Sequence, residues 1–396
     1  MPFGMEDALG PNRPAPPIHL LGRFQRRHPG GVKDPMISLA KAGPYTRLRN
    51  ELAASPRTWL ITGVAGFIGS NILHELLSFG QNVVGLDNFS TGYQANLDDV
   101  LATPAGKKGS FRLYKGDIRD IQACRKACRG VDYVLHHAAL GSVPRSIDDP
   151  ALSNSVNVDG FINVLLASNE AGVKRIVYAS TCAIYGDSPE LPLSEASTGN
   201  LLSPYAATKL ANEIYASVFQ RVYGVQLVGL RYFNIFGPRQ DPNGAYAAVI
   251  PRWISNLLSG EACQIFGDGE TSRDFCYVAN VAQANILAAT SARSFGDAEV
   301  YNVGLGRETT LNELFRMIRL GLVGLEPSIA TAQPVYSHFR DGDIRRSGAD
   351  ITKIQQQLEY EPTHTIAQGL GEALEWYVEH SAKSALVEES RIAALT

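Results

Sequence analysis

The stretch Thr58-Trp-Leu-Ile-Thr-Gly63-Val-Ala-Gly66-Phe-Ile-Gly69 decides the fold of this 396-residue chain. Its first five residues are an apolar run typical of a buried strand, three glycines follow at once, and helical periodicity is clear from Asn71. Glycine at 63 suits a turn that no Cβ tolerates. Glycine at 66 lets backbone N–H groups approach a pyrophosphate, and glycine at 69 allows close helix packing. The stretch therefore predicts a strand, an anion-binding turn and a helix.

A second apolar strand, Asn82-Val-Val-Gly-Leu86, ends at Asp87. This is close to the spacing expected for a carboxylate that accepts hydrogen bonds from an adenosine ribose. No arginine follows Asp87 directly, which favours NAD over NADP. A glycine triplet alone would suit a structural loop equally well, but strand, triplet, helix, strand and terminal aspartate together predict a dinucleotide cofactor.

The rest of the chain continues the alternation of strands and helices. This pattern predicts an α/β fold of the Rossmann type, with a doubly wound parallel sheet, right-handed crossovers and ligands at the carboxyl ends of the strands. Past residue 240 the rhythm breaks into shorter elements, which we expect to form a smaller C-terminal substrate-binding α/β region. Further buried strands are predicted at Phe111–Tyr114, Val131–Leu135, Arg175–Tyr178, Gln226–Leu230 and Val300–Val303.

The predicted organisation has four parts. Breaker-rich residues 1–43 are expected to be a disordered extension, and residues 44–240 to form mainly the cofactor domain, with a returning segment near 275–305. Residues 241–380 are expected to form mainly the substrate-binding cap, followed by a tail over 381–396.

Composition excludes several classes of function. The chain is 45% hydrophobic and 19% charged with a net charge of −3 and no basic stripe, so neither nucleic acid nor a membrane is expected as a partner. Five cysteines without zinc-like pairs predict a reducing compartment and no metal site, although Cys124 and Cys128, one helical turn apart, could in principle ligate one. No 18-residue apolar run or secretory signal pattern is present, which favours a cytoplasmic protein.

Tyr205 and Lys209 are the candidate chemical groups. Four residues apart on a predicted helix, they share one face, so the ammonium group could favour the ionised phenol. Lowering a phenol pKa from about 10 to about 7 needs roughly 4 kcal/mol. One cation at about 4 Å supplies roughly that amount in an effective dielectric of about 20, and a bound nicotinamide cation would add to it. A lone YxxxK pattern is more often a surface helix, and the dinucleotide motif upstream is what makes the pair informative.

In this order, the turn, Asp87, Gly116-Asp-Ile118, Tyr178-Ala-Ser-Thr181, Tyr205 and Lys209 resemble the extended short-chain dehydrogenase/reductase superfamily, specifically its NAD-dependent epimerase/dehydratase family. The resemblance covers roughly residues 45 to 380. It implies that Thr181, Tyr205 and Lys209 are catalytic, and it implies a cofactor site for NAD. The implied cofactor site comprises Gly63, Gly66, Phe67, Ile68, Gly69, Asp87, Asn88, Asp117, Ile118, Ala138, Tyr205, Lys209 and Tyr232.

Longer strings, Ala139–Ser146, Arg239–Pro251 and Gly269–Tyr277, are similar to UDP-N-acetylglucosamine 4-epimerases of bacterial surface-polysaccharide pathways, such as those for O-antigen or capsule. In such enzymes two arginines grip the UDP diphosphate, and a serine in place of a bulky tyrosine leaves room for an acetamido group. Substrate residues implied by the resemblance are Gly141, Ser142, Thr181, Tyr205, Asn234, Gln240, Ala248, Arg273, Arg340 and Ser347.

By resemblance, the phenolate of Tyr205 takes the proton of the sugar 4-OH, Thr181 relays that proton, and C4 gives hydride to NAD. The resulting 4-keto sugar turns over within the site and is reduced on its other face.

The residues after Thr181 leave the preferred sugar undecided, because Cys182 and Ala183 stand where many N-acetyl-sugar epimerases have hydroxyl residues. They also replace the Asp-Glu pair that a 4,6-dehydratase needs. A UDP-N-acetylglucosaminuronate or other UDP-hexose 4-epimerase is the main alternative, and a non-catalytic NAD-binding redox sensor a distant one.

The resemblance also implies a homodimer. Family members pair through the helix that carries Tyr205 and Lys209 and the helix before it, in a four-helix bundle. Alanines 206, 207 and 211 are expected to let the helices approach closely.

Overall fold

The structure is a computed structural model that describes residues 43–242, 247–297, 299–339 and 344–393, with side chains described up to residue 380. The predicted N-terminal extension therefore lies outside the described residues, except for Gly43. Across the part of the chain that is described, no helix has both the length and the apolar character needed to cross a membrane.

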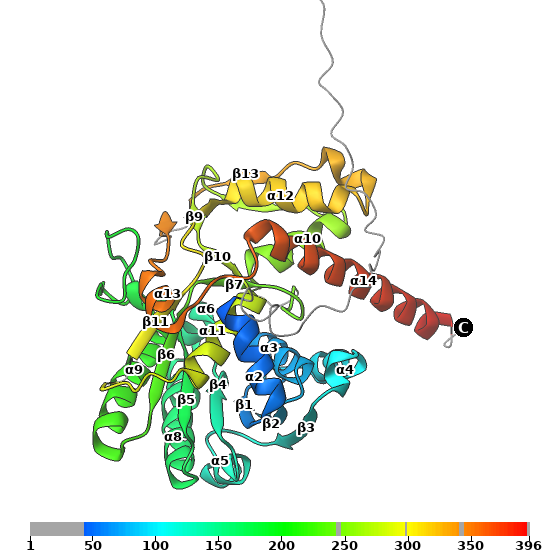
Figure 1. The fold of residues 1–396 in the computed structure, drawn as a ribbon. Coiled ribbons are helices and arrows are strands. Elements are labelled where there is room, and N and C mark those ends of the chain that lie inside the picture. Colours follow the sequence, from blue (N-terminus) through cyan, green and yellow to red (C-terminus); the bar gives the residue numbers. More distant parts are fainter. Residues whose placement is uncertain (1–42, 243–246, 298, 340–343, 394–396) are drawn as a thin grey trace, which may run out of the picture. The chain divides into compact units, whose positions relative to one another are not determined.

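A seven-stranded sheet in the order β11-β6-β5-β4-β1-β2-β3 forms the centre of the fold (Figure 1). Every neighbouring pair is parallel. The strand order reverses beside β1, and this switch point is where doubly wound sheets bind ligands. The predicted Rossmann-type fold is confirmed. Its strands are β1 (Thr58–Thr62), β2 (Asn82–Asp87), β3 (Ser110–Lys115), β4 (Tyr133–His136), β5 (Arg175–Thr181), β6 (Leu227–Tyr232) and β11 (Glu299–Val303).

Helices cover both faces of this sheet, and its central strands bury both of their sides. In β1, Trp59 and Ile61 join one apolar core, and Leu60 joins the other. Parallel strands covered on both faces read as continuous apolar runs, which is how β1 appears in the sequence. The first core packs against α3 (Phe67–Ser78), α4 (Gln94–Ala102) and α11 (Val278–Thr290), and the second against α5 (Ile121–Cys128), α8 (Gly160–Glu170) and α9 (Pro204–Tyr223).

A third apolar core lies in the C-terminal region, where Trp253, Phe315 and Leu374 are among its members. Its helices are α10 (Val249–Leu258), α12 (Leu311–Val323) and α14 (Ile366–Ala393), which Figure 1 shows beyond the carboxyl ends of the sheet strands. A further helix, α13 (Thr352–Leu358), packs on the first core instead.

Short strands of the same region pair with one another. They pair as β10 (Phe275–Tyr277) with β7 (Asn234–Phe236), β9 (Ser272–Arg273) with β12 (Thr309–Thr310) and β14 (Arg346–Ser347), and β13 (Val335–Ser337) with β8 (Gln264–Phe266).

Connecting helices complete the list of elements: α6 (Val143–Asp148), α7 (Pro150–Asn154), a π-helical turn η2 (Ser155–Asp159), and the 3₁₀ turns η1 (Ala105–Lys107), η3 (Cys182–Tyr185) and η4 (Pro327–Thr331).

Several predicted boundaries differ from the structure, and three of the differences show what sets an element's end. The helix after the glycine turn begins at Phe67, four residues before the expected Asn71, because Gly66 is its N-cap. The strand expected from Val131 begins at Tyr133, because Val131 still belongs to the turn after α5. The boundary expected at residue 380 falls inside α14, which runs on to Ala393.

One helix, α2 (Pro44–Ala54), precedes the dinucleotide motif and packs on α3. Tyr45 donates a hydrogen bond to Glu75 Oε1 at 2.8 Å, and Arg49 reaches Ser78 Oγ at 3.1 Å and Glu75 at 3.4 Å. These hydrogen bonds and the ion pair, which we call the polar clasp, connect Tyr45 and Arg49 of α2 to Glu75 and Ser78 of α3. Leu52 adds a buried apolar contact.

Candidate active site

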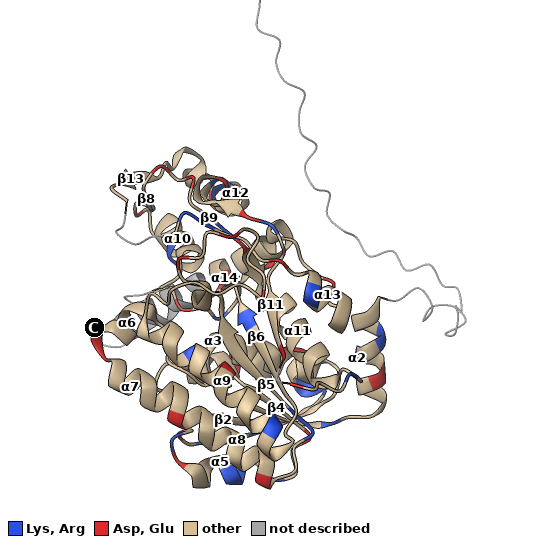
Figure 2. Ribbon diagram, turned by 90° about the vertical axis from the view of Figure 1, so that its left-hand side faces the viewer, with Lys and Arg blue, Asp and Glu red and all other residues tan. Residues whose placement is uncertain are grey.

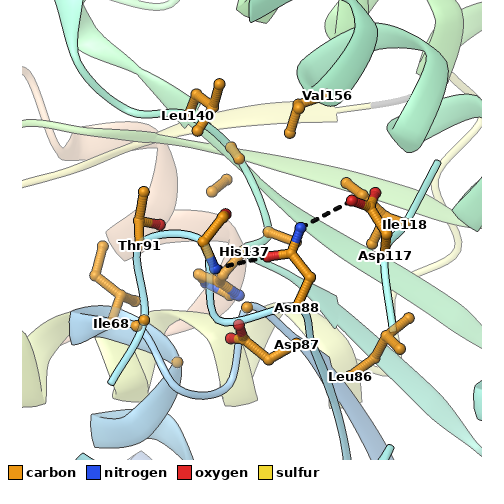
Figure 3. A pocket seen from close by; sticks show the side chains of 18 of the residues that line it. Ile68, Leu86, Asp87, Asn88, Thr91, Asp117, Ile118, His137, Leu140 and Val156 are labelled. Carbon is orange, nitrogen blue, oxygen red and sulfur yellow. Dashed lines mark hydrogen bonds between the residues drawn. The ribbon is translucent and has the colours of Figure 1, made fainter. Parts of the chain in front are cut away.

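A cavity of about 250 Å³ opens at the carboxyl ends of β1, β2 and β4 (Figure 3). Most of the residues predicted to bind the cofactor line it: Gly63, Gly66, Phe67, Ile68, Gly69, Asp87, Asn88, Asp117, Ile118 and Ala138. Sequence reasoning missed part of its wall, namely Ser90-Thr-Gly92, His137, Ala139, Leu140, Val156 and Ala179. Residues 90–92 could have been predicted from the sequence, because they form a polar turn shortly after Asp87.

The glycine turn has the geometry that the sequence predicted. Gly63 adopts φ +71°, and a Cβ there would lie 2.7 Å from the amide nitrogen of Ala138. A Cβ on Gly69 would collide with the carbonyl oxygen of Gly63. The first turn of α3 therefore lies directly against β1 and presents backbone N–H groups that have no acceptor within the helix. This cradle fits a dinucleotide pyrophosphate, which would rest on the positive end of the α3 dipole.

Asp87 stabilises the turn as well as lining the cavity. Its Oδ2 accepts from the amide of Ala65 at 2.8 Å, and its Oδ1 accepts from the amide of Phe89 at 2.8 Å. Each carboxylate oxygen keeps a further lone pair, so the side chain can still accept from ribose hydroxyls. These contacts fit the predicted ribose-binding role and give Asp87 a second one.

The far wall of the cavity is a hydrogen-bonded pair, Asn88 and Asp117, joined at 2.8 Å (Figure 3). Arg119 binds Asp117 through Nε and Nη2 at 3.0 and 2.8 Å. These hydrogen bonds hold the pKa of Asp117 well below its usual range, chiefly through the Arg119 side chain. Asp117 therefore stays ionised and fixed beside Ile118.

Tyr232 lies behind the cavity rather than in its wall. Its hydroxyl is 2.9 Å from His137 Nε2 and accepts from Asn285 Nδ2 at 2.7 Å, and its ring stacks on the His137 ring. His137 lines the cavity, and burial lowers its pKa to about 4, so its ring is neutral near pH 7. Tyr232 therefore meets the wall of the cavity through His137, and its contact with the cofactor stays a prediction.

The three predicted catalytic residues meet beside this cavity. Tyr205 is in the first turn of α9, whose N-cap Ser203 accepts from the amide of Ala206, and Thr181 is the last residue of β5. Thr181 and Tyr205 are joined by a side-chain hydrogen bond. Thr181 Oγ1 also accepts from the amide of Ala183 at 3.1 Å, so its own proton remains available to donate.

Lys209 is buried and donates from Nζ to the carbonyl oxygen of Ala179 at 2.9 Å. Burial lowers the pKa of Lys209 to about 8. Because Ala179 lines the cofactor cavity, this hydrogen bond fixes the ammonium group at the inner end of that cavity.

The structure shows no lowering of the Tyr205 pKa by Lys209 alone. Burial raises the pKa of Tyr205 to about 12, although the hydrogen bond from Thr181 acts in the opposite direction. The four-residue spacing places both residues on one helix face, but the ammonium group donates to the carbonyl of Ala179, and Lys209 is not among the groups that shift the Tyr205 pKa. Desolvation is therefore the largest influence on the pKa of this phenol, and the contribution expected from a bound nicotinamide cation stays a prediction.

A second cavity, of about 510 Å³, lies between β7, α10 and β9. Asn234, Gln240, Ala248 and Arg273 line it, as predicted for substrate-binding residues. Aromatic side chains missed from the sequence, Phe236, Trp253, Phe266 and Phe275, complete its walls. Gln240 Oε1 is buried and has no hydrogen-bond partner among the described residues, so the cavity presents an unused acceptor.

None of the other predicted substrate residues that the structure describes lines this cavity. Ser347 is buried in β14, in register with Arg273 of β9. Ser142 is the N-cap of α6 and accepts from the amide of Arg145 at 3.2 Å, and Gly141 directly precedes it. Arg340 lies outside the described residues.

Cys182 joins the two halves of the site. Its thiol interacts electrostatically with Tyr205 on one side and with Arg273 on the other. Burial raises its pKa to about 11, so the thiol is neutral near pH 7. The hydroxyl pair Thr181–Tyr205 is therefore close both to the cofactor cavity and to the arginine of the second cavity.

These features define an α/β enzyme that binds a dinucleotide and places a Thr-Tyr-Lys set beside it. The sequence model of the NAD dependent epimerase/dehydratase family matches residues 59–304, and the chain belongs to this family. NAD is accordingly its cofactor. No group of three or more His, Cys, Asp or Glu side chains among the described residues could hold a metal ion.

Relatives agree on the fold but differ in the sugar that their names give. A UDP-glucose 4-epimerase from Mycolicibacterium smegmatis is 37% identical over 320 residues, which cover 80% of this chain and 97% of that protein. The structure of a UDP-N-acetylglucosamine 4-epimerase from Methanobrevibacter ruminantium, bound to UDP-N-acetylmuramic acid, is 38% identical with a TM-score of 0.74 over 82% and 99% of the two chains. A Thermotoga maritima UDP-glucose 4-epimerase with UDP-glucose is 36% identical, with a TM-score of 0.72 over 82% and 99%.

Proposed function

We propose that this protein is an isomerase, a UDP-sugar 4-epimerase, and that its preferred reaction is the reversible conversion of UDP-N-acetylglucosamine to UDP-N-acetylgalactosamine. The observation that carries the proposal is the position of the Thr181–Tyr205 hydrogen bond between the cofactor cavity and the Arg273 cavity. A sugar whose diphosphate binds Arg273 would present its ring hydroxyls to this pair.

Within this site each residue has a defined task. Tyr205 exchanges a proton with the 4-OH of the sugar, and Thr181 holds that oxygen and relays the proton. Lys209, fixed by Ala179, supplies positive charge at the inner end of the cofactor cavity. NAD, when bound, supplies the hydride acceptor and a nicotinamide cation that favours the phenolate form. Because burial raises the pKa of Tyr205, that form depends on charge gathered at this point.

The second cavity suits the UDP moiety. Arg273 matches a diphosphate, since a guanidinium group binds such oxygens in a planar fork. The aromatic walls suit a base, and the unused Gln240 Oε1 can accept a hydrogen bond from the N–H of a uracil ring. A firm grip on the nucleotide with fewer contacts to the sugar would let the keto sugar rotate between the two hydride transfers.

The N-acetyl preference depends on Ser347. A serine beside Arg273 leaves space that a larger side chain would fill, and exclusion by overpacking costs about 1–3 kcal/mol. UDP-N-acetylglucosaminuronate and other UDP-hexoses remain the alternative substrates, and the name of the Mycolicibacterium relative favours UDP-glucose. A cytoplasmic enzyme of this kind would supply precursors for surface polysaccharides such as O-antigen or capsule.

A panel of UDP-sugars tests the proposal. Purified protein with its bound NAD is incubated with UDP-N-acetylglucosamine, UDP-glucose, UDP-glucuronate and UDP-N-acetylglucosaminuronate, and the products are identified by chromatography. We expect the highest kcat/KM for UDP-N-acetylglucosamine. A higher kcat/KM for a plain hexose or a uronate would reassign the substrate. A lack of turnover with every sugar, while NAD stays bound, would favour the redox sensor.

A further inference from the structure

Asp274 is a fully buried carboxylate at the centre of the substrate-binding region, and no catalytic or binding role described above uses it. It follows Arg273 directly in the chain. Its carboxylate accepts hydrogen bonds from the backbone amides of Leu305 at 2.8 Å, Gly306 at 2.9 Å and Ala349 at 3.4 Å. A buried carboxylate is costly unless such donors compensate it, so its retention here needs an explanation.

The backbone of Asp274 adds two further links. Its amide donates to the carbonyl of Ser347 at 2.9 Å, and its carbonyl accepts from the amide of Asn234 at 3.0 Å. One residue therefore connects the strands that carry Asn234, Arg273 and Ser347, which come from three distant parts of the sequence.

The neighbouring chain makes room for this carboxylate. A Cβ on Gly304 would lie 2.7 Å from Asp274 Oδ2 and 3.0 Å from Ala349 Cβ. Gly304 directly follows β11 of the cofactor sheet and leads into the loop that donates two of the amides. The carboxylate thus joins the edge of the cofactor sheet to the substrate-binding strands at a point where no side chain intervenes.

We propose that Asp274 is a positioning residue for UDP-sugar binding: by holding the 305–306 and 349 backbone segments, it sets the spacing between the arginine that binds the diphosphate and the serine wall beside the sugar. This inference rests on the proposed function. Asp274 itself touches neither ligand in this scheme, and its effect is on KM rather than on the chemical step.

The ionised form is the one that performs this task, since only a carboxylate offers both oxygens as acceptors to the amides. Burial raises the pKa of Asp274 to about 6, against the lowering effect of the backbone hydrogen bonds. A proton gained below that pH would turn one oxygen into a donor facing backbone N–H groups. KM for a UDP-sugar should therefore rise as the pH falls through 6.

Other groups around Asp274 keep their charge state across this range. Cys182, Cys276 and Tyr360 interact with it electrostatically, and burial raises the pKa of all three, so they remain neutral. On the adjoining elements, Arg273 and Arg307 are guanidinium groups, and the neighbouring Arg346 lowers the pKa of Glu308. A UDP-sugar diphosphate is esterified at both ends and has no proton that titrates near neutral pH.

The test compares Asp274→Asn with Gln81→Met in the NAD-loaded protein. Gln81 is a matched control because it is also fully buried and binds several backbone groups, but it lies at the amino end of β2, away from both cavities. For Asp274→Asn we expect KM for UDP-N-acetylglucosamine and Kd for UDP to rise at least tenfold, with kcat within about threefold and NAD retained. Gln81→Met should lower Tm and leave KM unchanged.

The pH profile gives a second readout. Wild-type KM should rise several-fold between pH 7.5 and 5.5, whereas KM of Asp274→Asn should be flat. If Asp274→Asn does not fold, Gly304→Ala replaces it, because the added methyl group displaces the same carboxylate and should raise KM in the same direction.

Two results would overturn the inference: a folded Asp274→Asn protein with KM and Kd within twofold of wild type, or a fall in kcat at unchanged KM. The proposed function fails in a different way, through a wild-type protein that retains NAD and binds no UDP.

Discussion

The phenol of Tyr205 is the group on which the chemistry depends. We expect Tyr205→Phe to lower kcat by about 10²–10⁴-fold, the range typical of a lost general acid–base group, because only the hydroxyl that meets Thr181 is removed. The measurement is epimerisation of UDP-N-acetylglucosamine, together with the NAD content per chain, which should not change. Tyr223→Phe, on the exposed last turn of the same helix, is the control. Near-normal activity of Tyr205→Phe would contradict its role.

Ser347 is the residue on which sugar selectivity depends. Ser347→Tyr should lower kcat/KM for UDP-N-acetylglucosamine at least tenfold more than kcat/KM for UDP-glucose, because Ser347 is buried and pairs in register with Arg273, which leaves little room for a larger side chain. Ser347→Ala keeps the space and should change the ratio little. Equal losses for both sugars in Ser347→Tyr would contradict the steric argument.

For individual residues, the sequence predicted which side chains line the cofactor cavity better than it predicted their pKa values. The residues of the glycine turn, Asp87 and Asn88 line the cavity as predicted, because a local motif fixes their positions. The pKa of Tyr205 could not be predicted, because it depends on burial and on the carbonyl that Lys209 selects. The role of Asp274 could not be predicted from the Gly269–Tyr277 string, because its hydrogen-bond partners lie about 30 and 75 residues further along the chain.

Among the helices and strands, the first turn of α3 is the element through which the glycine motif should affect NAD binding. Gly69→Ala should force α3 away from β1, because the new Cβ would meet the Gly63 carbonyl, and the NAD content of the purified protein should fall severalfold. Gly371→Ala in α14 is the control, since nothing lies within 4 Å of the added Cβ and alanine favours a helix by about 1 kcal/mol. Full NAD content in Gly69→Ala would contradict the close-packing argument.

Prediction also succeeded unevenly among elements. The buried strands of the sheet were located because continuous apolar runs mark them, although their ends shifted by one to three residues. The C-terminal region was harder to predict, because its two- and three-residue strands are defined by pairing with distant segments, such as β9 with β12 and β14. Such pairings leave no periodic pattern in a single sequence.

For the whole molecule, we propose a homodimer through α9. Ile214, Val218 and Val222 lie on one face and are 58%, 46% and 65% exposed, and Figure 2 shows few charged residues along this helix. Ala207 and Ala211 lie outside the core of the chain, as an interface residue must. Ala206 is fully buried within its own chain, so it packs inside the protomer rather than at this interface.

The mass of the protein in solution tests the proposed dimer. Val218→Glu would place one carboxylate from each copy in the interface, so its mass by light scattering should fall from twice the chain mass towards one chain. Leu320→Glu, at a residue 64% exposed on α12, is the matched control and should leave the mass unchanged. A wild-type mass of one chain, or a Val218→Glu variant that stays dimeric, would contradict this interface.

The polar clasp between α2 and α3 should affect the resistance of the enzyme to heat inactivation rather than its catalytic rate. Tyr45 and Arg49 precede the region matched by the family model, yet they hold the outer side of the helix whose first turn faces the cofactor. Loosening this clasp would leave the reacting groups in place and speed the opening of α3 on heating. Its effect would therefore appear in the half-life of activity at elevated temperature, which makes α2 a place where heat resistance can change while catalysis stays constant.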